Sequence, residues 1–264
     1  MLTVVLICLL LGCIAGFLAG LFGIGGGMVI VPVLVYVLPM VGVPEQLLMA
    51  SALGTSFATI VITGFSAAQR HHKLGNVDWR GVKYLAPSLI VAVFISGLFI
   101  GKLPKDISSK IFACLVIYLA GKMILSIKPK AKAVKPLTAQ AAVVGGGIIG
   151  VIASAAGIGG GGFIVPFLNS RGIDMKKAIG SSSVCGMLLG LSGMLSFVVG
   201  GWNSSLMPDF SLGYVYLPAV LCISATSFFT SKLGASTTNK LPVPTLKRYF
   251  ALLLIVIAVD MLIK

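Results

Sequence analysis

A glycine-rich motif occurs twice in this chain, each time inside apolar sequence. The first copy is GIGGGMVIVPVL, residues 23–34, and the second is GIGGGGFIVPFL, residues 157–168. Glycine lacks a Cβ and loses much conformational entropy in a helix, so each glycine run should interrupt the helix that enters it. A proline follows each run, and proline is tolerated near the start of a helix. The motif therefore predicts a helix, an unwound glycine segment and a second helix, made twice.

The sequence around the motifs is that of an integral membrane protein. Of the 264 residues, 58% are hydrophobic and 10% are charged, and the mean hydropathy is +1.09. No polar stretch has the length of a soluble domain, so one membrane domain is expected to make up the whole chain. The first apolar segment lacks a basic n-region and is expected to be a retained helix. Ten apolar segments are predicted, at residues 2–21, 28–40, 46–68, 82–100, 107–125, 138–156, 163–168, 178–199, 212–233 and 246–263.

Matching positions recur along the chain at nearly constant spacing. The glycine motifs align at an offset of 134 residues, and ALGTS at residues 52–56 aligns with AIGSS at residues 178–182 at an offset of 126. Pro104 and Pro242 continue the match at an offset of 138. We therefore predict a tandem duplication. Its parts are a first membrane repeat over residues 1–127, a basic linker over residues 128–136 and a second membrane repeat over residues 137–264.

The positive charges distinguish between two arrangements of these repeats. If the short segments 28–40 and 163–168 cross the membrane, each repeat has five crossings and the copies are inverted; if they are re-entrant, the copies are parallel. The inverted arrangement puts sixteen of the 20 Lys and Arg residues on one side, whereas the parallel one divides them almost evenly. In membrane proteins the cytoplasmic loops carry an excess of Lys and Arg. The predicted fold class is therefore an all-α polytopic membrane protein of about ten segments in two inverted five-segment repeats, with both termini outside and the linker cytoplasmic.

The paired motifs resemble those of the sulfite exporter TauE/SafE family of small membrane transporters. The resemblance covers nearly the full length and rests on both glycine motifs together with the AxGTS-like motif that follows each. It implies secondary transport of a small sulfur-containing anion, such as sulfite, a sulfonate or thiosulfate, across the cytoplasmic membrane of a bacterial cell. The second copy departs from the first by carrying Ser181 where Thr55 stands and Gly162 where Met28 stands.

An oxyanion inside the membrane needs dipoles or cations to balance its charge. The motifs offer backbone N–H groups at two helix starts, which are unpaired and lie at the positive end of the helix dipole, and nearby hydroxyls offer further donors. The structural alternative is that the glycines permit close helix packing and that the hydroxyls bond to helix carbonyls. The candidate substrate-binding residues are Gly23, Gly25, Gly26, Gly27, Met28, Thr55, Ser56, Gly157, Gly159, Gly160, Gly161, Gly162, Ser181, Ser182 and Ser183.

Other polar residues predict less about function. Five cysteines lie in apolar segments without a CxxC motif or an adjacent histidine, so we expect no disulfide framework, no metal site and no cofactor. Asp260 lies four residues from the C-terminus and is interpreted as an interfacial residue. His71 and His72 fall in a basic run and are interpreted as part of a solvated loop. Asn169 and Arg171 belong either to an ordinary loop or to an entry vestibule for anions.

Three classes of function compete. A secondary transporter with alternating access is the leading hypothesis, and an anion channel with the same site is the alternative. An intramembrane enzyme is disfavoured, because the sequence has no HExxH, no GxSxG and no His–carboxylate cluster for acid–base chemistry. Orientation in the bilayer explains the net charge of +14 without nucleic acid. The expected partners are the anion and the lipid bilayer, and the sequence leaves a homodimer open.

Overall fold

The computed structural model describes residues 2–23, 25–125, 136–238, 251–252, 254–256 and 259. Two 3-10 turns, η1 Leu38–Val41 and η2 Glu45–Leu47, connect the second helix to the third. Most of the predicted basic linker, most of the tenth segment and Asp260 lie outside these residues. The helices are α1 Leu2–Phe22, α2 Gly27–Val37, α3 Leu48–Lys73, α4 Trp79–Ile100, α5 Lys105–Leu125, α6 Ala139–Ala156, α7 Gly161–Ser170, α8 Met175–Gly200 and α9 Leu217–Thr237.

Six helices in the described part of the chain are long and apolar enough to cross a membrane. They are α1, α3 together with η2, α4, α6, α8 and α9, and α3 is the most deeply buried of them. The α2 helix continues through η1 as a shorter apolar helix over residues 27–41. The protein is therefore a polytopic membrane protein built almost wholly of helices, as the composition predicts.

The ninth predicted segment begins later than expected. Residues 211–216 form an antiparallel hairpin of two short strands, β1 Ser211–Leu212 and β2 Val215–Tyr216, and α9 starts only at Leu217. Gly213, with a φ of 57°, makes the turn between the strands. The predicted start at Leu212 is therefore wrong, because an apolar run alone does not distinguish a buried strand from a helix.

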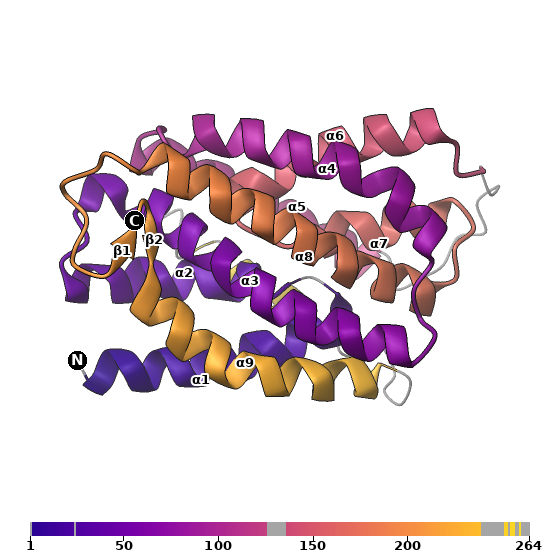
Figure 1. Cartoon of the computed structure of the whole chain (residues 1–264), viewed down its shortest axis with the longest axis horizontal. Helices are drawn as coiled ribbons and strands as arrows, with labels where there is room; N and C mark the ends of the chain where they lie inside the picture. The colour runs from indigo at the N-terminus through magenta and orange to yellow at the C-terminus, as the bar shows by residue number, and fades with distance from the viewer. Residues whose placement is uncertain are drawn as a thin grey trace.

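The outer helices pack in pairs drawn from distant parts of the sequence (Figure 1). The α1 helix lies along α9, and α4 lies along α6, with the two members of each pair running in the same direction. At the contacts a glycine of one helix faces the backbone of its partner. These contacts join Gly12 to Ile223, Gly16 to Ser227, Gly20 to Ser231, Gly146 to Leu85 and Gly150 to Leu89.

At the centre of the bundle α3 and α8 cross in opposite directions. Their close contacts join Gly54 to Phe197, Phe57 to Gly193, Gly64 to Met187 and His71 to Gly180. The α3 helix also packs in the same direction as α9, and α8 in the same direction as α4. Because α1 and α3 both run parallel to α9, α2 and η1 must bring the chain back between them.

The bundle has two ends that matter for the site (Figure 1). We call the end that carries β1 and β2, on the left of the figure, the hairpin end. We call the other end, where residues 74–78 connect α3 to α4, the turn end. The N-terminal parts of α3 and α8 lie toward opposite ends, so equivalent motifs on these two helices point to opposite sides of the molecule.

Candidate functional site

Both glycine motifs break a helix where the sequence predicts a break. The α1 helix ends just before Gly23, and α2 begins just after Gly26; α6 ends just before Gly157, and α7 begins just after Gly160. All four glycines have a positive φ, between 58° and 79°. Residues with a side chain rarely adopt this left-handed conformation, so glycine is required at these positions.

The two breaks meet at the centre of the protein. A Cβ added to Gly25 would lie 2.9 Å from the Cα of Gly159, which is the equivalent residue at the offset of 134. A Cβ added to Gly162 would lie 3.2 Å from Cε of Met28, again its equivalent. The side chain of Met28 therefore occupies space that a side chain at residue 162 would need. This contact explains why the second motif carries an additional glycine.

The starts of α2 and α7 leave backbone donors unpaired. In α7 the first amides to bond are those of Phe163 and Ile164, which both donate to the carbonyl of Gly160, at 2.9 and 2.8 Å. Within the described part of the chain, the amides of Gly161 and Gly162 donate to no acceptor. The α2 helix starts in the same way. Each break thus presents the positive end of a helix dipole in the protein interior, which favours a bound anion.

Two serine hydroxyls connect the breaks to α3 and α8. Ser56 on α3 donates to the carbonyl of Gly157 at 2.8 Å. Ser182 on α8, its equivalent at the offset of 126, donates to the carbonyl of Gly23 at 3.2 Å and to that of Ile179 in its own helix at 2.7 Å. Each predicted repeat therefore holds the glycine break of the other. Ser183 instead bonds within its own helix.

The neighbouring hydroxyls of the AxGTS-like motifs bind the starts of two other helices. Thr55 Oγ1 accepts a hydrogen bond of 3.0 Å from the amide of Tyr216, the residue before α9. Ser181 Oγ accepts one of 2.8 Å from the amide of Asp78, the residue before α4. We call the first bond the hairpin-end clasp and the second the turn-end clasp. Tyr216 and Asp78 are themselves equivalent at the offset of 138.

A third matched couple of hydroxyls was not among the predicted site residues. Ser66 on α3 donates to the carbonyl of Phe228, and Ser192 on α8 donates to the carbonyl of Ile90. The sequence contains these serines as aligned positions, but alignment alone does not say what they bind. In this conformation the hydroxyls of α3 and α8 connect helices, as the structural alternative predicts for polar residues in membrane helices.

Comparison with known proteins identifies the family. The model of the family "Sulfite exporter TauE/SafE" matches residues 8–261. The chain belongs to the TauE/SafE family. A probable membrane transporter protein of Haemophilus influenzae is 68% identical to it over 264 residues, the full length of both chains. A probable membrane transporter protein of Methanocaldococcus jannaschii is 27% identical over 239 residues, 88% of this chain and 86% of the relative. No solved structure matches the chain.

The family match confirms the resemblance drawn from the paired motifs of this TauE/SafE protein. The names of its relatives support a membrane transporter in the cell membrane rather than an enzyme. They do not name a substrate. The geometry of the two breaks is therefore the main guide to the substrate.

One interpretation of the sequence of this TauE/SafE protein is wrong. His71 is not part of a solvated loop: it lies in the last turn of α3, is 0% exposed, and places Nε2 at 3.1 Å from the carbonyl of Gly20. His72 is exposed, and its ring meets that of Trp79 edge-on at 5.5 Å. The α3 helix continues through the basic run, and one histidine of the two faces the interior.

Asn169 lies in the last turn of α7 and Arg171 directly follows the helix, at the end opposite its glycine start. Asn169 donates to the carbonyl of Ile173 at 3.2 Å. Arg171 donates to the carbonyl of Pro136 at 3.3 Å, and its guanidinium lies 5.3 Å from the ring centre of Phe167. These contacts hold the C-terminal end of α7 and the turn that follows it.

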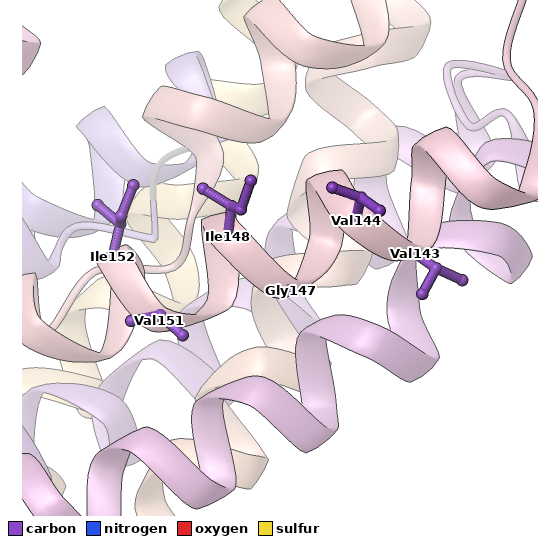
Figure 2. A pocket seen from close by; sticks show the side chains of 6 residues that line it. All are labelled: Val143, Val144, Gly147, Ile148, Val151 and Ile152. Atoms are coloured by element: carbon purple, nitrogen blue, oxygen red, sulfur yellow. The ribbon is translucent and has the colours of Figure 1, made fainter.

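Two shallow apolar grooves lie on the outer face of α6, with volumes of about 460 and 340 Å³. Figure 2 shows the larger one, in which Val144, Ile148 and Ile152 point to one side of the helix. Both grooves are lined almost wholly by apolar side chains, and within the described residues neither touches a glycine break. They belong to the lipid-facing surface of this TauE/SafE protein rather than to an anion site.

Proposed function

We propose that this protein is a secondary transporter that exports a small sulfur-containing anion, such as sulfite, a sulfonate or thiosulfate, across the cytoplasmic membrane. Membership of the family and the names of the relatives support transport, and the name of the family supports the substrate class. A potential that is negative inside drives an anion outward by about 2.3 kcal/mol per charge per 100 mV. Export of this kind needs no coupling ion.

We place the substrate between the starts of α2 and α7. The observation that carries this proposal is the contact of Gly25 with Gly159, because it brings two helix N-termini together in the protein interior. The unpaired amides of Gly161 and Gly162 are donors of the kind an oxyanion needs. Glycine backbone lets an anion approach these amides closely. Dipoles without a fixed cation also let the anion leave again.

The bonds of Ser56 and Ser182 suggest how an empty site is held closed. Each hydroxyl has one proton, which now goes to a carbonyl of the opposite break or of its own helix. An arriving oxyanion competes for the same protons. We therefore propose that substrate binding replaces these serine–glycine bonds and so loosens α3 and α8 from the breaks.

We further propose ten crossings in two inverted repeats, over residues 1–127 and 137–264. The AxGTS-like motifs begin α3 and α8, which run in opposite directions, and this supports inversion. The parallel course of α1 and α3 supports a crossing of the short segment between them. The charge division then puts the turn end in the cytoplasm and the hairpin end outside. Alternating access would open the two ends in turn.

A binding screen tests the substrate and the site. The purified protein is heated with sulfite, sulfate, thiosulfate or a short sulfonate, and a ligand at 100 times its dissociation constant should add about 2.7 kcal/mol to stability. Gly26→Val and Gly160→Val should remove binding by blocking the amides. Because both positions have a left-handed φ, Gly162→Ala is added as a variant at a helical position. If folded variants all bind with wild-type affinity, the anion does not lie at the breaks.

Flux from proteoliposomes distinguishes a transporter from a channel. A transporter should saturate with substrate concentration and should exchange labelled for unlabelled substrate across the membrane. Flux that rises linearly with concentration and shows no such exchange would favour an anion channel with the same site.

A further inference from the structure

We propose that His71 is a proton-binding residue that controls opening at the turn end of the bundle. The proposal rests on the transport function proposed above, in which the turn end opens and closes. It concerns the ring nitrogen Nδ1, which the anion site does not use. The ligand is a proton taken from water on the side that the turn end faces.

The His71 ring is buried with one nitrogen unpaired. Its side chain is 0% exposed, and Nε2 lies 3.1 Å from the carbonyl of Gly20. A carbonyl only accepts, so Nε2 carries the hydrogen and the neutral ring presents Nδ1 as an acceptor. Within the described part of the chain, Nδ1 has no partner. Buried nitrogens without a partner are rare, and this one is the atom that would take a proton.

A second unpaired group lies in the same turn. Asn76 is 9% exposed, and its Nδ2 has no partner among the described residues. The amide of Asn76 donates to the carbonyl of His71 at 2.9 Å, and Gly75 between them has a φ of 70°. This is the Schellman end of a helix, and Cβ of His71 and the carbonyl of Asn76 both lie against the position of a Cβ on Gly180. A proton on Nδ1 would therefore add a second unpaired donor and a positive charge to a turn whose Asn76 Nδ2 is already unpaired.

The same turn closes the end of the bundle against α8. The carbonyl carbon of Asn76 lies 2.7 Å from the position of a Cβ on Gly180, and the amide of Asp78 forms the turn-end clasp with Ser181. The new N–H at Nδ1 of a protonated His71 has no described acceptor in this closed arrangement, and a buried charge without an acidic partner is costly. The turn must then move toward water, which releases α8.

The hairpin end of the bundle has no ionisable side chain at the position equivalent to His71. At the offset of 126 the equivalent of His71 is Phe197, which is 0% exposed. A Cβ on Gly54 would lie 3.0 Å from Cβ of Phe197, just as a Cβ on Gly180 would lie 3.2 Å from Cβ of His71. The two ends therefore share one packing arrangement, with a phenyl ring at the hairpin end and an imidazole at the turn end. Only the turn end can respond to pH through this position.

No described residue forms an ion pair with His71. Arg70 instead donates to Ser236 at 2.8 Å, and Lys232 lies 4.0 Å from the ring centre of Phe228. Protonation of His71 is therefore governed by the access of water rather than by a fixed partner. The titratable groups on the surrounding elements are Cys8 and Cys13 on α1, Arg70, His72 and Lys73 on α3, Asp78 in the turn, Arg80, Lys83 and Tyr84 on α4, Lys176, Lys177 and Cys185 on α8, and Cys222 and Lys232 on α9.

The fluorescence of Trp79 tests the proposal without a substrate. Trp79 begins α4 next to the turn, and the chain has one other tryptophan, Trp202. In a Trp202→Phe, His72→Gln background, Trp79 emission should change in a single titration between about pH 8 and about pH 5. His71→Phe, which copies the hairpin end, should abolish the titration, and His71→Gln should do so if the phenylalanine variant does not fold. A titration that persists in a folded His71 variant overturns the proposal.

Transport gives the second measurement. If a protonated His71 keeps the turn end open, the rate should fall about tenfold per pH unit below the titration midpoint, as for one ionising group. His71→Phe should be insensitive to pH, and His72→Gln should keep the wild-type profile. Equal profiles for wild type and His71→Phe contradict the proposal. Loss of the transport hypothesis alone would leave the Trp79 titration intact, so the two failures are distinguishable.

Discussion

The hydroxyl of Ser56 donates a hydrogen bond of 2.8 Å to the carbonyl of Gly157, 101 residues further along the chain. Ser182 makes the equivalent bond to Gly23 in the opposite sense. Together these bonds tie each glycine break to a helix of the other predicted repeat. The breaks are therefore held by side chains from outside their own repeat, and changes at either serine should affect both the stability of the bundle and its closure.

Ser56→Ala should lower the free energy of unfolding by about 1–3 kcal/mol, because it leaves the buried carbonyl of Gly157 without a donor. Thermal unfolding in detergent measures the effect. The control is Ser183→Ala, whose hydroxyl bonds only within α8 and whose loss should change stability by no more than about 0.5 kcal/mol. Equal effects of the two substitutions would show that the bond to Gly157 contributes nothing to stability.

Gly25→Ala should destabilise the protein by at least about 1–2 kcal/mol, because residue 25 has a φ of 81° and a Cβ there would press on Gly159. The matched control is Gly147→Ala on α6, where nothing lies within 4 Å of an added Cβ. This control should be neutral or stabilising by up to about 1 kcal/mol. Chemical denaturation of both variants separates the predictions, and a stable, wild-type-like Gly25→Ala would mean that the breaks do not touch.

Substitutions at Met28 and Gly162 should have non-additive effects on stability. Met28→Ala should cost about 2–5 kcal/mol by opening a cavity, and Gly162→Met alone should cost about 1–3 kcal/mol by overpacking against Met28 and Leu119. The double change Met28→Ala with Gly162→Met restores one methionine to the shared space and should recover about 0.5–3 kcal/mol relative to the sum of the two single changes. Additive effects in this cycle would contradict a shared space.

The sidedness of the bundle predicts where reporters are active. A periplasm-dependent reporter fused after Lys264 should be active, and a cytoplasm-dependent reporter inserted at Lys130 should be active as well, because the proposed inverted arrangement puts sixteen of the 20 cations on the linker side. Activity of a cytoplasm-dependent reporter after Lys264 would contradict the inverted ten-crossing arrangement with both termini outside.

The helix breaks were predictable because their cause is local. Glycine at residues 23, 26, 157 and 160 adopts a positive φ that other residues avoid, so the glycines of the motif are enough to predict the breaks. The pairing of α1 with α9 was not predictable in the same way. Its contacts join small residues such as Gly16 and Ser227, which lie far apart in the sequence and carry no charge or motif that marks a partner.

The burial of His71 had a signal that the basic run concealed. On α3 the buried residues Gly64, Ala67 and Ala68 lie seven, four and three positions before it, so His71 continues the buried face at helical spacing. Arg70 and Lys73 lie on other faces of the same helix. Their charges led to the interpretation of the whole basic run as a solvated loop. The charge of sequence neighbours does not predict whether one residue of a helix is buried, because consecutive residues of a helix point in different directions.

The packing of α1 on α9 has a consequence for how the protein is made. The glycine face of α1 leaves the ribosome first, yet the partner that covers it, residues 223–231 of α9, is more than 200 residues later in the chain. At ordinary rates of synthesis this delay is roughly 10–40 s. During that interval the nascent first helix lies in the bilayer with its glycines uncovered and available to other segments. A protein truncated before α9 should therefore be recognised as misassembled and degraded, however complete its glycine breaks are.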